Sequence, residues 1–237
     1  MSTQGQKVAV ITGASQGIGA ELVGAYRALG HAVVATSRTI GASRDPGVIT
    51  VQGDIAERAT AERVVAAGLE RFGRIDTLVN NAGVFVSKPF TEFTQDDFDT
   101  VMGVNVAGFF HMTRLVVPRM LEQGGGHVVQ ITTSLVDHPR AAVPSVLASL
   151  SKGGLQAATK ALAIEYASRG IRSNAVSLGT IATPMHAEDQ HEELAALHPV
   201  GRMGRARDIA DAVVYLENAP FVTGAVLHVD GGQAAGG

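Results

Sequence analysis

Short apolar segments alternate with longer segments of helical spacing along the whole sequence. The first, Lys7–Ile11, is apolar and β-branched, and helical spacing from Ile18 to Leu29 follows it after a glycine-rich stretch. Segments that are apolar on both faces are typical of strands in a buried parallel sheet, whose neighbours are connected through helices. We therefore predict an α/β fold, a doubly wound parallel sheet with helices on both faces. The further strands are expected at 32–36, 48–52, 75–79, 127–132, 172–177 and 225–229, and the further helices at 57–71, 95–122, 145–168 and 207–217.

The composition excludes several classes of protein. The sequence contains no cysteine, so disulfide scaffolds, thiolate zinc sites and iron–sulfur clusters are excluded. A formal net charge of −3 gives no electrostatic basis for binding nucleic acid or an anionic membrane, and we expect neither partner. No uninterrupted apolar run reaches the roughly 18 residues of a transmembrane helix, and the polar start Ser2–Gln6 lacks the apolar stretch of a signal peptide, so we expect a cytoplasmic protein. No shift in composition divides the chain, so we expect one domain over residues 1–237.

The glycine-rich stretch after the first strand is a candidate phosphate site. It reads Thr12-Gly13-Ala14-Ser15-Gln16-Gly17-Ile18-Gly19, with glycines in the spacing G-x-x-x-G-x-G. Glycine allows a sharp turn and close approach of backbone N–H groups to a pyrophosphate, which the N-terminus of the following helix favours. The alternative is an ordinary turn between a strand and a helix, because a glycine motif alone is only a hypothesis.

The end of the second predicted strand indicates which nicotinamide cofactor would bind. An acidic residue at this place binds the 2′-hydroxyl of the adenosine ribose, whereas an arginine accommodates a 2′-phosphate. The chain reads Thr36-Ser37-Arg38-Thr39 and has no acid until Asp45. The pattern favours NADP(H), with Arg38 and nearby hydroxyls as donors. A solvated arginine at a polar strand end is the alternative.

Several motifs, in this order along the chain, resemble those of the short-chain dehydrogenase/reductase family. They are Thr12–Gly19 (TGxxxGxG), Asp54 after the third strand, Asn80–Gly83 (NNAG), Asn105, Ser151–Lys152 (the end of YxxxK), Leu178–Thr183 (PGxxxT, with leucine for proline), Phe221–Gly224 and Asp230–Gly232. The resemblance covers nearly the whole chain. It implies a Rossmann-type fold, a nicotinamide cofactor, and a substrate lid at about 184–205.

The resemblance also assigns roles to residues. It implies catalytic roles for Asn105, Ser134 and Lys152, with Lys152 also binding the nicotinamide ribose. In the family, two long helices pair with those of a second subunit, so we expect a homodimer or homotetramer. The residues expected to bind the cofactor are Gly13, Ser15, Gln16, Gly17, Ile18, Gly19, Ser37, Arg38, Asp54, Ile55, Asn81, Ala82, Gly83, Lys152, Gly179, Ile181 and Thr183.

One residue departs from the family pattern at the centre of the expected active site. Family carbonyl reductases carry a tyrosine four residues before the lysine, one helical turn away, and the lysine makes that phenol a better proton donor. Here this position is Ala148, and no tyrosine occurs between positions 27 and 165. Either Thr133 or Ser134 could be the substrate-orienting hydroxyl, depending on a one-residue register, and we favour Ser134.

Other side chains could supply the missing proton. His138 is a candidate because imidazole is a common general acid, and it lies in the loop that the family uses to line its substrate cleft. Ser145 and Ser149 are weak acids, and Lys152 could act through a water in the tyrosine's place. Ala148, His138 and Met185 are expected to line the substrate. The spacing of His186, His191 and His198 does not make a compact metal site, and we expect no metal.

Two functions fit these observations. The first is an NADP(H)-dependent oxidoreductase that transfers hydride to or from a small carbonyl compound, alcohol or imine. Iminium ions fit an active site without a phenol, because they arrive protonated and need no acid during hydride addition. The second is a catalytically impaired protein that senses NADPH or regulates a partner. The preserved motifs favour the oxidoreductase, and Ala148 favours the sensor.

Overall fold

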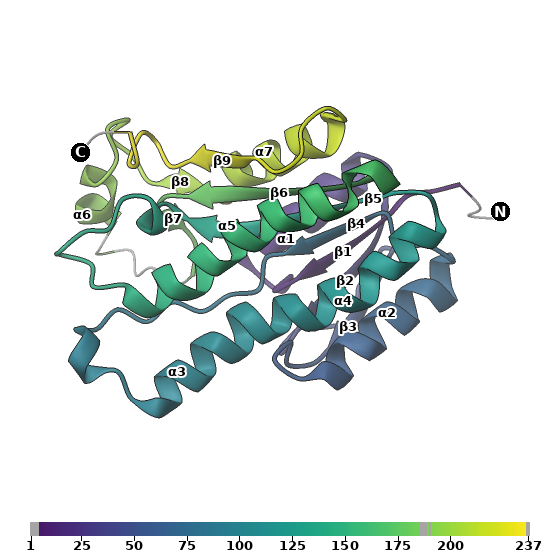
Figure 1. Cartoon of the computed structure of the whole chain (residues 1–237), viewed down its shortest axis with the longest axis horizontal. Helices are drawn as coiled ribbons and strands as arrows, with labels where there is room; N and C mark the ends of the chain where they lie inside the picture. The colour runs from purple at the N-terminus through teal and green to yellow at the C-terminus, as the bar shows by residue number, and fades with distance from the viewer. Residues whose placement is uncertain (1–4, 185–188, 190, 236–237) are drawn as a thin grey trace.

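The core of the structure is a seven-stranded parallel sheet. The computed structural model describes residues 5–184, 189 and 191–235, and its strands lie in the order β3-β2-β1-β4-β5-β6-β9 (Figure 1). All six neighbouring pairs are parallel, which confirms the predicted Rossmann-type doubly wound sheet. The strands are β1 (Val8–Thr12), β2 (Ala32–Ser37), β3 (Val48–Gln52), β4 (Thr77–Asn80), β5 (Gly126–Thr133), β6 (Ile171–Leu178) and β9 (Val226–Val229).

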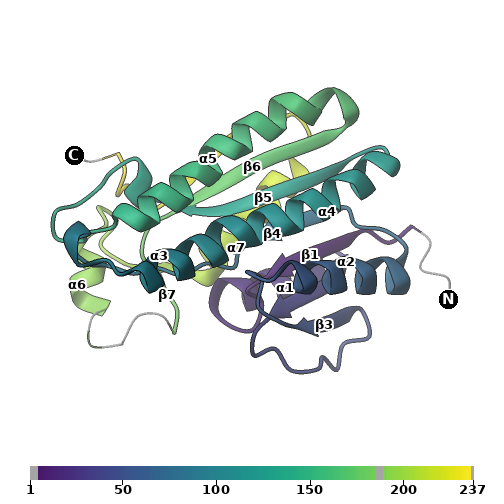
Figure 2. The ribbon, with the colours of Figure 1, turned by 60° about the horizontal axis from the view of Figure 1, so that its bottom comes forward.

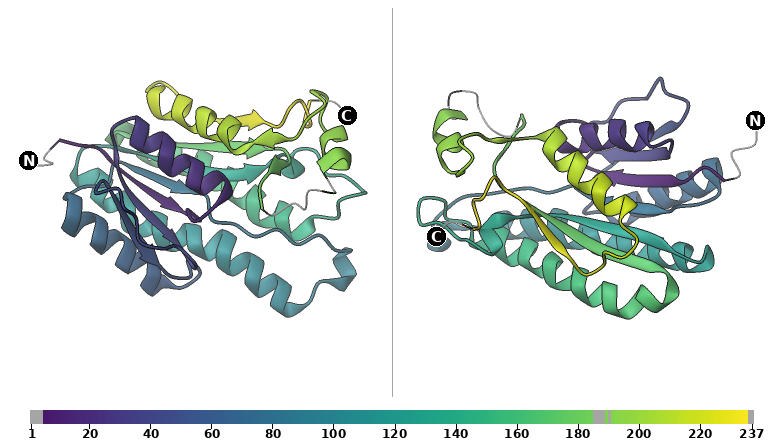
Figure 3. Two further views of the ribbon diagram at one scale, coloured as in Figure 1. Left: turned by 180° about the vertical axis from the view of Figure 1, so that it is seen from behind. Right: turned by 90° about the horizontal axis from the view of Figure 1, so that it is seen from above.

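Helices cover both faces of the sheet, because β-branched residues project from both faces of strands such as β1 and β2. Figure 2 shows α2 (Arg58–Phe72), α4 (Gly108–Glu122) and α5 (Val146–Tyr166) across one face. On the opposite face, α1 (Gly17–Ala28) packs against α7 (Ala206–Asn218), as the view from behind in Figure 3 shows. Each face therefore has its own apolar core.

The helix predicted over 95–122 is interrupted, which corrects the expectation of one regular helix. It begins as α3 (Gln95–Met102) behind a Thr94 capping box, passes through a π-helical turn (Gly103–Ala107), and continues as α4. The turn widens because Asn105, at its centre, bonds outside the helix. Such insertions are frequent at functional sites.

The run Gln95–Glu122 is long and apolar enough to cross a bilayer if only length and composition are considered. Core helices of water-soluble proteins meet the same criteria. In this chain packing accounts for part of the apolar character of α4, since Met112, Val116 and Met120 are buried in the core between the helices and the sheet.

A small parallel pair lies beside the main sheet. β7 (Ile181–Ala182) pairs with β8 (Gly204–Arg205), so the two ends of the segment expected to be a lid are held together. Within it, α6 (His191–Ala196) lies close to the carboxyl ends of the strands (Figure 1). Met185 and His186 lie outside the described residues, so the prediction that Met185 lines the substrate stays a prediction.

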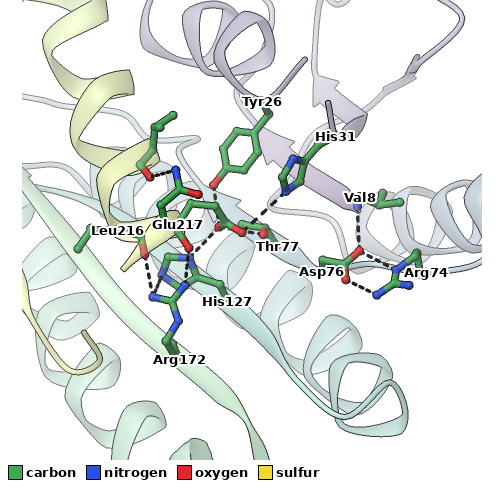
Figure 4. A network of polar contacts seen from close by, with 12 residues as sticks. Val8, Tyr26, His31, Arg74, Asp76, Thr77, His127, Arg172, Leu216 and Glu217 are labelled. Atoms are coloured by element: carbon green, nitrogen blue, oxygen red, sulfur yellow. Dashed lines mark hydrogen bonds and ion pairs between the residues drawn. The ribbon is translucent and has the colours of Figure 1, made fainter. Parts of the chain in front are cut away.

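A buried polar cluster, here called the Glu217 network, lies at the opposite end of the sheet (Figure 4). The Glu217 carboxylate, at the end of α7, receives hydrogen bonds from Thr77 Oγ1 (3.0 Å) and Tyr26 OH (3.3 Å), and it lies 2.9 Å from His127 Nδ1. Burial raises the pKa of this carboxyl, but the contacts to His127 and His31 lower it more, so the pKa lies well below its ordinary value. The network joins α1, α7 and the starts of β4 and β5.

The network also fixes the tautomer of His127. The side-chain amide of Asn174 is oriented by the backbone, since its Oδ1 accepts from Ala225 N, and its Nδ2 donates to His127 Nε2 at 3.1 Å. A ring nitrogen that accepts carries no proton, so the proton of a neutral His127 is on Nδ1 and is donated to Glu217. Burial lowers the pKa of His127, which agrees with a neutral ring.

Candidate functional site

A cleft of about 790 Å³ opens at the carboxyl ends of the strands, where the chain order reverses between β1 and β4. Ligands of open α/β sheets bind at this topological switch point. The residues expected to bind a cofactor all line the cleft, from the glycine loop through Arg38 and Asp54 to Thr183. Segments far apart in the sequence meet in this cleft, because all the parallel strands end at the same edge of the sheet.

The glycine loop is clamped by the segment after β4. Thr12 Oγ1 accepts hydrogen bonds from the backbone N–H groups of Asn81 (3.1 Å) and Ala82 (3.0 Å), and Asn81 Nδ2 donates to Thr12 O at 2.9 Å. Gly13 has φ +66°, and a Cβ on it would lie 2.9 Å from Ala82 Cα, so a side chain is excluded twice over. These hydrogen bonds explain why the glycine loop and the Asn80–Gly83 motif occur together in one chain.

The helix that follows the loop presents its N-terminus to the cleft. The Ncap residue of α1, Gln16, makes no side-chain cap hydrogen bond, and Gly17 begins the helix with φ +55°. Gln16, Gly17 and Ile18 all line the cleft. Free N–H groups and the positive end of the helix dipole suit a pyrophosphate, so this part of the cleft fits a dinucleotide.

The end of β2 presents one uncompensated cation. Arg38 is exposed and lines the cleft, and within the described part of the chain its guanidinium forms no ion pair. The nearest following acid, Asp45, is 2.8 Å from Arg27 Nε and accepts from Gly47 N, and it does not line the cleft. This ion pair removes Asp45 as a partner for a ribose hydroxyl and leaves Arg38 free for a phosphate.

Lys152 lies deep in the cleft. Its ammonium donates to Ile131 O at 2.8 Å, and a Cβ on Gly83 would lie only 2.8 Å from Nζ. Part of the side chain faces the open cleft, but the ammonium is deep enough that burial lowers the pKa of Lys152 to about 8. A lysine of this kind can both donate hydrogen bonds and release a proton near neutral pH.

Asn105 lies beneath the cleft rather than on it. Its Oδ1 accepts from Val84 N at 2.9 Å, and its Nδ2 donates to Val84 O at 3.1 Å and to Ser151 Oγ at 3.0 Å. The residue is buried and is not among those that line the cleft. It ties the π-helical turn to α5 next to Lys152, so the geometry gives it a positioning role.

The two candidate hydroxyls at the end of β5 have different surroundings. Ser134 is buried and its Oγ donates to Gln233 Oε1 at 2.7 Å, whereas Thr133 is half-buried and its hydroxyl accepts from Leu135 N at 3.3 Å. Both line the cleft. Because the Ser134 hydroxyl already donates to Gln233, the hydroxyl proton of Thr133 is the more available of the two for a hydrogen bond to a substrate.

Gln233 is a cleft residue that sequence reasoning missed. It follows the turn Asp230–Gly232, in which Asp230 accepts hydrogen bonds from Gly232 N and Ala234 N. The two glycines have positive φ, which turns the chain back toward β5. The Asp-Gly-Gly pattern was the available signal for the turn, but nothing in it indicates what the next side chain touches.

At the substrate end of the cleft, Ala148 lines the wall and is buried. The described residues that line the cleft include no tyrosine. They also do not include His138, whose place in the loop is fixed by its backbone N–H donating to Ser134 O, so the expectation that His138 lines the substrate is not met. Leu135, Arg140, Val143, Leu194 and Leu197 form this end instead.

His198, one of three spaced histidines, has a structural role. Its Nε2 accepts from Thr180 N at 2.9 Å, and Nδ1 lies 3.0 Å from Leu194 O, so the neutral ring joins α6 to the loop after β6. The described residues contain no group of histidine and acidic side chains that could hold a metal ion.

Residues 13–234 match the model of a protein family described as Enoyl-(Acyl carrier protein) reductase. The chain is 37% identical over 251 residues to 2-(R)-hydroxypropyl-CoM dehydrogenase of Xanthobacter autotrophicus, covering 97% of this chain and 99% of that protein. Its fold is similar to that of 3-ketoacyl-(acyl-carrier-protein) reductase from Brucella melitensis complexed with NADH, with a TM-score of 0.90, 32% identity, and 96% and 98% of the two chains covered. It is also similar to ElxO with NADP bound, with a TM-score of 0.89, 27% identity, and 97% and 99% covered.

Proposed function

The chain belongs to the short-chain dehydrogenase/reductase family, and from this membership we propose that it is an NADP(H)-dependent oxidoreductase acting on a small carbonyl compound, alcohol or imine. The observation that carries the cofactor choice is the guanidinium of Arg38 at the end of β2, which forms no ion pair among the described residues. Similar structures contain NADH or NADP, which supports a nicotinamide cofactor of either kind. The positive charge at the end of β2 supports NADP(H) rather than NAD(H).

Each part of the cleft has a role in this proposal. The N-terminus of α1 binds the pyrophosphate, Arg38 and Ser37 bind the 2′-phosphate, and Lys152 donates to the nicotinamide ribose. Gly179, Ile181 and Thr183, which also line the cleft, hold the carboxamide in this proposal. When bound, the nicotinamide supplies or accepts the hydride.

Replacing Arg38 by aspartate is expected to abolish the preference for NADPH over NADH. The substitution removes a charge-assisted contact worth about 1.5–3 kcal/mol, so NADPH affinity falls about 10- to 150-fold, and a carboxylate becomes available for the 2′-hydroxyl. Fluorescence titration with both cofactors measures the change. Arg44→Asp, an exposed arginine away from the cleft, is the matched control. Equal affinities of the wild type for NADH and NADPH would contradict the assignment.

A proton must reach the substrate oxygen when a ketone is reduced, and Ala148 cannot supply it. In this proposal Lys152, deep in the cleft, donates the proton through a water that occupies the volume of the missing tyrosine. Thr133 or Ser134 orients the substrate. The reduction of a protonated imine needs no proton donor in this site, because the substrate already carries the proton.

Ala148→Tyr is expected to increase ketone reduction about tenfold or more while leaving cyclic-imine reduction unchanged or lower. A positioned general acid contributes about 10²- to 10⁴-fold, of which an introduced phenol recovers a part, and the ring also fills substrate space. Ala148→Phe is the control, since it fills the same volume without a proton. A wild type that reduces ketones rapidly and ignores imines, with no gain from the tyrosine, would contradict this interpretation.

The second candidate function is an NADPH-binding sensor with little turnover, favoured by the alanine at position 148. NADPH consumption against a panel of ketones, aldehydes and cyclic imines, with NADH measured in parallel, distinguishes the two. Turnover of any class supports the oxidoreductase. Tight NADPH binding without turnover of any of them supports the sensor.

The proposal includes a homodimer or homotetramer. Helices α3, α4 and α5 expose large apolar side chains, including Phe98 (40% exposed), Phe110 (52%), Leu150 (56%) and Ile164 (86%). Exposed apolar groups of this size on neighbouring helices are typical of surfaces that pack against another chain.

A further inference from the structure

One cation at the substrate end of the cleft is not used by the proposed chemistry. Arg140 lines the cleft, and its Nη2 donates to Leu197 O at 3.1 Å. Its Nε is screened from solvent and has no hydrogen-bond partner among the described residues. A guanidinium offers five N–H donors in a fixed fork, and a screened donor without a partner is energetically unfavourable.

The local fold holds Arg140 in this position. Its carbonyl accepts from Val143 N at 3.0 Å, which closes a tight turn before α5. Ala142 and Val143, in the same turn, also line the cleft. On the other side, the contact with Leu197 connects the guanidinium to the end of α6. The side chain is thus fixed from two directions by segments that form the substrate end.

The surroundings of Arg140 are mostly apolar. Leu135, Leu178, Leu194 and Leu197 line the cleft. Glu193 also lines the cleft but is exposed, and within the described residues Arg140 takes part in no ion pair. A substrate that matches this lining has an apolar body and one oxyanionic group, because the fork of an arginine binds a planar carboxylate through two parallel hydrogen bonds.

We propose that Arg140 binds an oxyanionic group of the substrate, so that the preferred substrates are oxo or imino acids rather than neutral ketones or imines. This inference rests on the proposed function for the identity of the reacting group. The contact itself depends only on binding, and sulfonates share the necessary chemistry with carboxylates. Arg140 is then a specificity-determining residue.

The test compares 2-, 3- and 4-oxohexanoate with their methyl esters, which share the carbon skeleton but lack the charge. For the oxo acid that the wild type uses best, Arg140→Gln is expected to lower kcat/KM by about 10- to 150-fold, the equivalent of one hydrogen bond to a charged group, with the ester unchanged. Arg140→Lys keeps the charge without the fork and should retain part of the preference. Arg44→Gln is the control for removing an exposed arginine. Equal losses on acid and ester, or no loss on the acid, would overturn the proposal.

Calorimetric titration with hexanoate and hexanamide, in the presence of NADPH, tests the contact without any turnover. Tighter binding of hexanoate that disappears in Arg140→Gln supports the anion site even if no substrate is reduced. Equal binding of the two compounds to the wild type, or no binding of either, overturns it. Titrating hexanesulfonate in the same way distinguishes a carboxylate site from a general oxyanion site. NADPH titration of the same variant is expected to match the wild type, so failure of the proposed cofactor would be seen separately.

Discussion

Replacing Lys152 by methionine is expected to lower kcat for ketone reduction by about 10²- to 10⁴-fold, the contribution of a general acid. Methionine has a similar length but neither a proton to release nor a donor for the ribose. NADPH binding should weaken as well, by about 10- to 150-fold, because a hydrogen bond from a charged donor is lost. Steady-state kinetics and cofactor titration measure the two effects separately.

The pH profile distinguishes a proton-donating lysine from one that only binds the cofactor. With a pKa of about 8, the Lys152 ammonium is present below that pH and lost above it, so reduction should slow as pH rises through about 8. Lys160→Met, at an exposed position of the same helix, should leave the rate and the profile unchanged. Unchanged turnover and cofactor affinity in Lys152→Met would show that this lysine has only a packing role.

Glu217→Ala is expected to destabilise the protein by about 3–5 kcal/mol, because each buried donor left without an acceptor costs about 1–3 kcal/mol. The substitution leaves the donors of His127, Thr77 and Tyr26 without their acceptor in a region that water does not reach. Urea unfolding measures the change. Glu122→Ala removes an exposed carboxylate paired with Arg119 and should cost less than about 1 kcal/mol.

The same network predicts how stability depends on pH. Folding lowers the pKa of Glu217 below its ordinary 4.5, so its contribution is present above that pH and is lost as pH falls through the folded value. Folding also lowers the pKa of His127 below 6.5, so protons favour the unfolded chain below that pH. The free energy of unfolding should therefore decrease on acidification from about pH 6.5. A stability that rises on acidification, or a Glu217→Ala variant as stable as the wild type, would contradict this account.

Much of the fold could be predicted because its signals are local. Strands such as β1 and β2 are continuous apolar runs, and the glycine loop lies between one of them and a helix. The break at 103–107 could not be predicted, since the π-helical turn depends on contacts of Asn105 with Val84 and Ser151, distant in the sequence. Gly103, the first residue of the turn, and Gly108, which follows it, permit the break without specifying it.

The candidate site divides in the same way. Residues carried by motifs, such as Gly13 and Lys152, line the cleft as expected. Gln233 and Arg140 were missed because each enters the cleft from a loop whose path is set by tertiary contacts. His138 was expected there because of its loop, but the hydrogen bond from its backbone N–H to Ser134 O sets its place, and the cleft lining does not include it. The residues that line the cleft are thus predicted better from motifs at the strand ends than from the position of titratable residues in loops.

The central claim is that this cleft binds NADP(H) through Arg38. The most direct test is a fluorescence titration of the wild-type protein with NADPH and with NADH at the same ionic strength. The account predicts that NADPH binds at least about tenfold more tightly, as expected for one charge-assisted contact to the 2′-phosphate. NADH binding as tightly as NADPH or more tightly, or no binding of either cofactor, would contradict it.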